Sequence, residues 1–314
     1  MPQKVILDVD TGTDDAVALM VAALSPELEL VGATTVNGNT RVENCTENTL
    51  RVFDYIGKSH IPTFQGMSLP LVRPHPEQFR TQLSGIHGDF LDLPAAVTRV
   101  RPQHAVDWLI ETYMQSDGDI ILVPVGPLTN IAAAIRKEPR ILAKIPELVI
   151  MGGAHDHGNS TPSAEFNIWL DPEAARIVVN CGRPIRMIPL DATHRALVSR
   201  EDCARLREIG TPAAIATAIC TERRISGYDK SQPMHRLGAA PVHDALAVCA
   251  IIDPTVVTTQ FINVDVETSG PLTDGRTVCD FRHRSLGAPN VHFATDADEP
   301  KFVRMLMEIL GRTA

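Results

Sequence analysis

The sequence lacks the features that mark nucleic-acid-binding, membrane-spanning and disulfide-bonded proteins. Its 29 lysines and arginines are outnumbered by 38 aspartates and glutamates, and the net charge of −9 comes without the basic stripe that phosphate binding requires. No apolar run is long enough to cross a bilayer, and no leader-like apolar region precedes the first strand-like segment. We therefore expect a soluble, cytoplasmic protein with no nucleic-acid partner and no membrane partner.

Cysteine pairs of the kind that bind zinc or carry out redox chemistry are also missing. The six cysteines are scattered, with no C-x-x-C motif and no Cys/His pair at zinc spacing. We expect reduced thiols that are mostly buried. The composition is otherwise that of a globular protein, 44% hydrophobic and 21% charged over 314 residues. This length suits one large α/β domain, which we expect to span residues 1–314.

Short β-rich runs alternate with helical patterns along most of the chain. The expected strand and helix pairs are 5–9 with 14–25, 29–36 with 41–57, 119–125 with 128–142, 147–152 with 171–181, and 185–190 with 199–210. The strands are continuous apolar runs, which is typical of a parallel sheet covered by helices on both faces. The pattern predicts a single-domain, doubly wound α/β fold with a mostly parallel sheet. We expect a long loop over 66–102, β-like segments at 260–267 and 276–281, and a final helix at 299–310.

Polar residues and glycines follow several predicted strands at the point where each strand ends. They are Asp8 and Asp10, Asn37 and Asn39, Gly126, residues 151–153, and Asp191. Each one alone is typical of a tight turn. Together they lie at the carboxyl ends of parallel strands, the edge at which open α/β sheets bind ligands. We therefore expect a ligand site along this edge.

The stretch LDVDTGTDDA at residues 7–16 places four aspartates within eight positions. Asp14 or Asp15 is positioned to cap the helix that follows. Asp8 and Asp10 need another explanation, because alternation along a strand puts both side chains on one face. Convergent carboxylates without cysteine or a neighbouring histidine suit Ca²⁺ or Mg²⁺ rather than zinc. A bound cation would also remove the repulsion within the cluster.

Two chemistries fit such a cluster. The D-x-D pattern resembles the start of haloacid-dehalogenase-type phosphatases, in which Asp8 would be the nucleophile and Asp10 the general acid and base of a Mg²⁺-dependent reaction. That family also needs a late acidic pair, for which we find no convincing match, and a Ser or Thr at the end of the third strand, which 124–127 does not have. The other chemistry is hydrolysis, in which an aspartate deprotonates a water held by the metal and the water attacks carbon.

The full spacing D-x-D-x-G-x-D-D resembles the opening of the inosine–uridine nucleoside hydrolase family. Further segments match the family in the same order along the chain: 125–130 (VGPLTN), 151–153 (MGG), 158–162 (GNSTP), 164–167 (AEFN), 171–175 (DPEAA) and 243–245 (HDA). One short motif can arise by chance, whereas this ordered set is specific and spans most of the chain. The resemblance implies the Rossmann-like nucleoside hydrolase fold and hydrolysis of the N-glycosidic bond of ribonucleosides to ribose and a free base.

The resemblance also implies a Ca²⁺ ion that holds the attacking water and the ribose diol. Its ligands would be Asp10, Asp15, the carbonyl oxygen of Val125, and Asp244. Asp10 would also be the general base for the water. Asp8 is left as support behind the metal site.

Further residues would bind the nucleoside. The residues that would contact the ribose or pack beneath its ring are Asp14, Asn39, Met151, Asn159, Glu165 and Asn167. His243 would be the catalytic acid that protonates the leaving base, because histidine donates near neutral pH. His87 and Tyr228 are the candidates for contact with the base. Carboxylates around the ribose would stabilise the oxocarbenium-like transition state.

The segments 87–94 and 226–241 depart from the common family pattern, so the preferred base is not predicted. Trp108 and Trp169 are the two tryptophans, and Trp169 lies in a matched structural stretch, so we expect no purine sandwich between tryptophans. The resemblance implies a homodimer or a homotetramer. The two alternatives are the Mg²⁺-dependent phosphatase and a nucleoside-binding protein without turnover.

Overall fold

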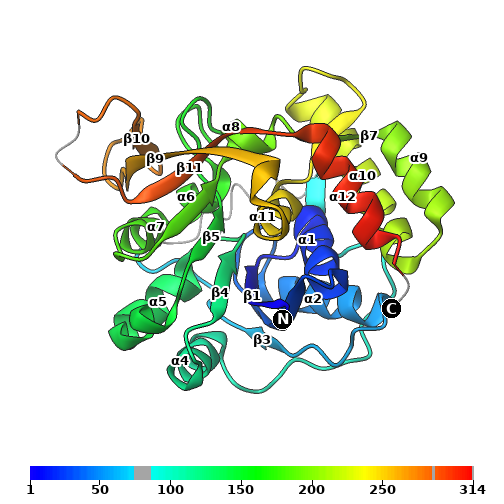
Figure 1. Ribbon diagram of the computed structural model, residues 1–314, viewed down its shortest axis with the longest axis horizontal. Coiled ribbons are helices and arrows are strands. Elements are labelled where there is room, and N and C mark those ends of the chain that lie inside the picture. Colours follow the sequence, from blue (N-terminus) through cyan, green and yellow to red (C-terminus); the bar gives the residue numbers. More distant parts are fainter. Residues whose placement is uncertain (74–85, 285–286, 313–314) are drawn as a thin grey trace.

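The five continuous apolar runs that the sequence predicted as strands form the middle of the central sheet. The computed structural model describes residues 1–73, 86–284 and 287–312. In this part of the chain, nine strands form one sheet in the order β10-β9-β11-β6-β5-β4-β1-β2-β3 (Figure 1). In chain order they are β1 (Gln3–Val9), β2 (Leu28–Thr35), β3 (Thr63–Gln65), β4 (Ile120–Pro124), β5 (Leu148–Met151), β6 (Ile185–Ile188), β9 (Val257–Val266), β10 (Thr277–Asp280) and β11 (Val291–Ala297).

The strand pairing makes the sheet mostly parallel and doubly wound. The seven neighbouring strands β11-β6-β5-β4-β1-β2-β3 pair in parallel. Strand β9 is antiparallel to both of its neighbours, β11 and β10. From β1 the chain moves outward to β2 and β3, and it then returns to the other side of β1 to continue through β4, β5 and β6. The direction therefore reverses between β1 and β4, the point at which such sheets bind ligands. The predicted fold class is confirmed.

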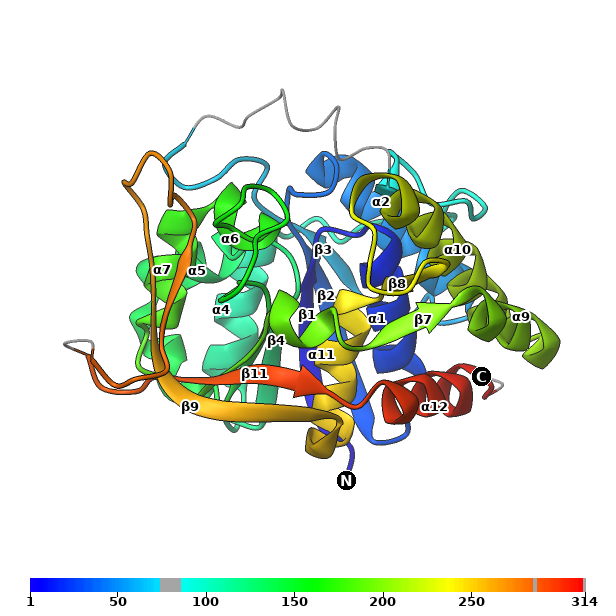
Figure 2. The ribbon, with the colours of Figure 1, turned by 90° about the horizontal axis from the view of Figure 1, so that it is seen from above.

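Helices cover both faces of the sheet (Figures 1 and 2). One face is packed by α4 (Ala105–Gln115), α5 (Thr129–Lys137) and α7 (Pro172–Val179). The other is packed by α1 (Thr13–Leu24), α2 (Val42–Tyr55) and α11 (His243–Ile252). An outer layer against α1 consists of α9 (Arg200–Ile209), α10 (Pro212–Ser231), α12 (Glu299–Leu310) and the ribbon of β7 (Leu197–Ser199) with β8 (Ala239–Pro241).

Helix α1 lies between the sheet and this outer layer, and this position explains its sequence. All residues from Thr13 to Ala22 are buried, and after the two aspartates the helix is apolar on every side. A helix that is apolar all round belongs in an interior. Its first turn, which carries Asp14 and Asp15, is thereby held at the carboxyl end of β1, inside the protein rather than in solvent.

Some predicted boundaries differ from the observed ones. The helix predicted over 128–142 ends at Lys137, because Pro139 has no N–H to continue it and begins a 3₁₀ helix, η1 (Pro139–Lys144). The sequence patterns did not reveal the helices α4 and α10 or the strands β3, β7, β8 and β11. Helix α10 is buried from two sides and therefore lacks the single apolar stripe that identifies a surface helix. The remaining short helices are α6 (Phe166–Leu170), α8 (Leu190–Thr193) and η2 (Pro254–Val256).

Residues 74–85 of the predicted loop over 66–102 lie outside the described residues. The rest of the loop is irregular, apart from the helical residues 86–87 and a single bridge between Arg101 and Phe64. None of the helices in the described ranges is both long enough and apolar enough to cross a membrane. The six cysteines, all within the described residues, form no disulfide, and four of them are buried, as expected.

Candidate active site

A pocket opens at the carboxyl edge of the sheet, next to the point where the strand order reverses. The empty space between its walls is about 490 Å³, including the part open to solvent. The residues that line it are Asp10, Asp14, Asn39, Ile86, His87, Val125, Met151, Asn159, Glu165, Phe166, Asn167, Arg224, Tyr228, Gln232, His243 and Asp244. The structure thus brings together nearly all of the predicted site residues, and Asp15 lies just beneath them, bonded to Asp10.

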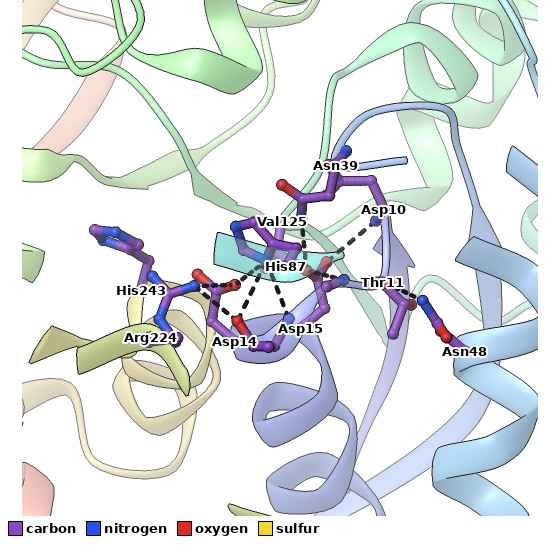
Figure 3. A network of polar contacts seen from close by, with 12 residues as sticks. Asp10, Thr11, Asp14, Asp15, Asn39, Asn48, His87, Val125, Arg224 and His243 are labelled. Carbon is purple, nitrogen blue, oxygen red and sulfur yellow. Dashed lines mark hydrogen bonds and ion pairs between the residues drawn. The ribbon is translucent and has the colours of Figure 1, made fainter. Parts of the chain in front are cut away.

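The turn between β1 and α1 is held by hydrogen bonds to its own carboxylates. Asp15 accepts from the backbone N–H of Asp10 (3.1 Å) and of Gly12 (2.9 Å), and so caps α1. Asp10 Oδ2 accepts from the backbone N–H of Asn39 (2.7 Å), and Asn39 Nδ2 donates to Asp15 (3.2 Å). The segment after β2 is thereby fastened to the turn after β1 (Figure 3).

Two glycines permit this close packing. A Cβ on Gly12 would overlap the His87 ring and would lie 2.8 Å from Asn39 Nδ2. A Cβ on Gly38 would collide with the Asp10 carboxylate. Neither position has room for a side chain, so both glycines are required by the approach of neighbouring groups and not by backbone conformation.

Three buried carboxylates form a candidate cation site. One oxygen from each of Asp14, Asp15 and Asp244 lies within 4.8 Å of the others. Asp10 lines the same pocket but is outside this group, and the Val125 carbonyl accepts a hydrogen bond from Asn167 Nδ2 (2.7 Å). The geometric group therefore shares Asp15 and Asp244 with the predicted ligand set and adds Asp14. A donor set made only of oxygen fits Ca²⁺ or Mg²⁺.

The electrostatics of the pocket also fit a cation. Burial and then repulsion from Asp14 raise the pKa of Asp15 to about 7. Burial raises the pKa of Asp244 well above its usual range, and the nearby Asp14, Asp15 and Asp10 raise it further. Burial and then Asp15 likewise raise the pKa of Asp10. A cation among these oxygens would relieve both the repulsion and the loss of solvation.

His87 is held at the first turn of α1 in one tautomer. The backbone N–H of Thr13 donates to His87 Nδ1 (3.1 Å), and Asp14 Oδ1 lies 3.8 Å from the same nitrogen. Burial lowers the pKa of His87 to about 4, so the ring is neutral at pH 7. Because Nδ1 accepts a hydrogen bond, the proton of the neutral ring is on Nε2. His87 therefore presents an N–H donor.

His243 is buried at the start of α11 with both ring nitrogens in hydrogen bonds. Nε2 lies 2.6 Å from the Tyr228 hydroxyl, and Nδ1 lies 2.7 Å from Thr193 Oγ1. Burial lowers the pKa of His243 well below its usual range, and Arg224 lowers it further. Any proton that His243 supplies therefore comes from a neutral N–H within this chain of three groups.

The opposite wall comes from the segment between β5 and α6. Glu165 caps α6 and accepts from the backbone N–H of Gly153 (3.0 Å) and of Ile168 (3.2 Å). Burial raises the pKa of Glu165 to about 7. Asn159 Oδ1 accepts from the Phe166 N–H (2.9 Å), and Asn167 Nδ2 also contacts the carbonyl (3.3 Å) and the sulfur (3.6 Å) of Met151. These residues line one wall of the pocket together with Met151.

Asp8 and Asp191 do not line the pocket. Asp8 accepts from Thr34 Oγ1 (2.5 Å) and from Asn130 Nδ2 (2.7 Å), on the α5 side of the sheet. Alternation does not place it beside Asp10, because β1 ends at Val9 and Asp10 already lies in the turn. This geometry counts against Asp8 as a phosphatase nucleophile. Asp191 accepts from the backbone N–H groups of residues 155 and 156 and supports that loop.

Four pocket residues were not expected from the sequence: Ile86, Phe166, Arg224 and Gln232. Arg224 is the most unusual of them, because it is a charged side chain that is 1% exposed. Once α10 is recognised as a helix, the spacing itself gives a signal: Arg224 precedes Tyr228 by four residues, one helical turn, so both share a face.

Nearly the whole chain is similar to known proteins of the family that the sequence motifs indicated. Residues 5–304 match the family described as inosine-uridine preferring nucleoside hydrolase. The chain is 41% identical over 319 residues to the inosine-uridine preferring nucleoside hydrolase of Leishmania major, covering 99% of this chain and 98% of that one. It is 42% identical over 282 residues to the pyrimidine-specific ribonucleoside hydrolase RihB of Escherichia coli O157:H7, covering 88% and 87%.

A solved structure is similar as well. The purine-preferring ribonucleoside hydrolase from Gardnerella vaginalis superimposes with a TM-score of 0.91 at 36% identity, covering 98% of both chains. The expected family is confirmed. The chain belongs to the inosine-uridine preferring nucleoside hydrolase family and is a hydrolase of N-glycosyl compounds.

Proposed function

We propose that this enzyme hydrolyses the N-glycosidic bond of ribonucleosides in a calcium-dependent reaction in which Asp10 deprotonates the attacking water. The observation that carries the proposal is the group of buried carboxylates in a pocket whose other walls carry hydrogen-bonding side chains, including amides and histidines. An oxygen-only cluster of this kind fits a hard cation, and the polar walls fit a sugar.

The cation would be held by Asp10, Asp15, Asp244 and the Val125 carbonyl, with Asp14 close enough to compete for it. When bound, Ca²⁺ would orient and acidify the water and hold the ribose diol. Asp10 suits the task of base because its carboxylate lines the pocket, next to the carboxylates that would hold the cation. The hydrogen bond from the Asn39 N–H fixes Oδ2 of this carboxylate in place.

The ribose would lie between the acidic turn and the wall formed by Asn159, Glu165 and Asn167. Cleavage builds positive charge on the sugar, and the carboxylates of Asp14 and Glu165 would stabilise it from two sides. Asn39 and Asn167 offer amide groups that can pair with sugar hydroxyls.

The leaving base would lie toward His87, Tyr228 and His243. His87 offers its Nε2–H, and His243 offers a proton through the hydroxyl of Tyr228, to which it is hydrogen-bonded. Both histidines are neutral at pH 7, so each acts as an N–H donor rather than as an imidazolium. A homodimer or homotetramer and a cytoplasmic location stay predictions.

The test is a nucleoside panel assayed for ribose release, first with the purified enzyme, then after chelation, and then with Ca²⁺ or Mg²⁺ restored separately. We expect release that chelation abolishes and that Ca²⁺ restores. Release that persists in chelator, or that only Mg²⁺ restores, rejects the calcium part of the proposal. The absence of ribose release from every nucleoside, together with either nucleoside binding or phosphate release from phosphomonoesters, rejects the hydrolysis reaction itself.

A further inference from the structure

Arg224 is a buried arginine of α10 that contacts the acidic turn from the side opposite β1. Its side chain is 1% exposed, and Nη1 lies 2.7 Å from Asp14 Oδ1 (Figure 3). Nη1 also donates to Thr13 Oγ1 (3.2 Å), and Nε donates to the carbonyl of Pro241 (2.8 Å). The guanidinium lies over the Tyr228 ring, 5.4 Å from its centroid.

A buried guanidinium is costly unless its charge and its donors are satisfied, so its location calls for an explanation. Asp14 supplies the opposite charge. Yet Asp14 Oδ1 has no hydrogen-bond partner among the described residues, because its contact with Arg224 is close but not aligned as a hydrogen bond. This oxygen is therefore neutralised in charge while it keeps a lone pair for another donor.

The Asp14 carboxylate can either bind a cation or pair with Arg224. Its carboxylate is close enough to Asp15 and Asp244 to join a cation between them, and it is also paired with Arg224. A carboxylate that joined the cation would be removed from the substrate. The Arg224 charge offers Asp14 an alternative partner to the cation.

We propose that Arg224 is a positioning residue of the reaction, which keeps the Asp14 carboxylate off the cation and directed to a ribose hydroxyl. This inference rests on the proposed function. It also gives a reason for the contacts of Arg224 with Pro241 and Tyr228. Pro241 lies two residues before His243, and Tyr228 lies one turn beyond Arg224 and contacts His243. One side chain thus fixes the ribose side of the pocket relative to the base side.

The test separates the effect on the reaction from the effect on the cation. Arg224→Met removes the charge but keeps much of the volume, and Arg224→Lys keeps the charge but loses the Nε–H that donates to the Pro241 carbonyl. The control is Arg207→Met, which breaks the ion pair of Arg207 with Glu222 on the outer face of α10 (2.6 Å, Arg207 45% exposed). For each variant we would measure kcat and KM, Ca²⁺ binding to chelated protein by calorimetry, and thermal unfolding.

For Arg224→Met we expect kcat to fall about 100-fold, the usual size of a misplaced substrate contact. Ca²⁺ binding should stay equal or become up to about tenfold tighter, because a positive charge near the cation has been removed. Arg224→Lys should recover about tenfold in kcat with Ca²⁺ binding within about threefold of the wild type. The control should match the wild type in all three measurements.

A kcat within about threefold of the wild type in Arg224→Met overturns the inference, as does a loss of Ca²⁺ binding that parallels the loss of kcat. If Arg224→Met does not fold, Arg224→Lys decides alone: a tenfold lower kcat than the wild type at unchanged Ca²⁺ binding supports the inference, and wild-type kcat rejects it. Should the wild-type protein release no ribose, the proposed function fails, while the calorimetry still shows whether Arg224 controls the carboxylates around the cation.

Discussion

The hydroxyl of Tyr228 lies 2.6 Å from His243 Nε2, and the other nitrogen of the His243 ring lies 2.7 Å from Thr193 Oγ1. The three groups form a buried chain that joins α8, α11 and α10 and ends at the pocket. Because burial lowers the pKa of His243 well below its usual range, this chain carries hydroxyl and N–H donors but no positive charge. Its use to the reaction would be to pass a proton to a leaving base.

Tyr228→Phe tests that use. Removal of the hydroxyl should lower kcat about 100-fold on natural nucleosides, the lower end of the range for one proton-transfer group. The loss should be under about threefold on a nitrophenyl riboside, since that leaving group needs no proton. Steady-state kinetics on both substrates measure the difference.

Tyr113→Phe is the matched control, because the Tyr113 hydroxyl is buried in α4 and has no hydrogen-bond partner in the described ranges. It should leave kcat unchanged on both substrates. Equal losses on both substrates in Tyr228→Phe would mean that the hydroxyl supports the pocket and does not serve the leaving base.

Asp10 and Asp8 are two residues apart, yet only Asp10 lines the pocket. Asp10→Asn should lower kcat about 1,000-fold, within the range for the loss of a general base. Asp8→Asn should keep kcat within about threefold and lower stability by about 1–3 kcal/mol, because the new amide N–H₂ would be buried without an acceptor. The measurements are ribose release and urea unfolding. The reverse order of activities would favour the phosphatase chemistry, in which Asp8 is the nucleophile.

Glu165 should give part of the stability a dependence on pH. Its pKa in the folded protein is about 7 because of burial, against an ordinary value of 4.5, so the folded state binds the proton more tightly than the unfolded state. The contribution of this group is therefore fully present below pH 4.5 and is lost as the pH rises to about 7. The loss is on the order of 3 kcal/mol.

Glu165→Gln cannot titrate, so its free energy of unfolding minus that of the wild type should increase across this interval. Urea unfolding of both proteins at several pH values from 4.5 to 8, in chelator, measures the difference. If the difference in unfolding free energy does not change with pH, the pKa of the Glu165 carboxyl is not raised in the folded protein. Subtraction of the two curves removes the contributions of the other buried carboxyls.

Much of this architecture was predictable because it is encoded in contiguous residues. Continuous apolar strands followed by helices predicted the doubly wound sheet, and the polar residues that follow those strands predicted the edge of the pocket. The four aspartates of 7–16 were correctly expected to cluster near it, with the exception of Asp8. That exception arises because β1 ends at Val9, so the two-residue alternation that aligns strand side chains does not extend to Asp10.

Contacts between distant segments were not predictable in this way. Arg224 donates to Thr13 across 211 positions, and Asn130 donates to Asp8 across 122. No local pattern specifies which buried arginine meets which carboxylate, since that depends on how α10 packs on α1. The tautomer of His87 likewise depends on a backbone N–H that belongs to another segment.

Gly12 provides the sharpest test of the packing at the acidic turn. A Cβ there would overlap the His87 ring, and the backbone of Gly12 has a φ of −102°, which any residue can adopt. Gly12→Ala should therefore destabilise the protein by about 1–3 kcal/mol through overpacking alone. In a His87→Ala background the space is free on that side, so the same substitution should cost less than about 1 kcal/mol. Urea unfolding of the four proteins of this cycle measures the coupling. An equal loss of unfolding free energy in both backgrounds would mean that His87 does not occupy the position described. The conclusion that its Nε2–H donates into the pocket would then be wrong as well.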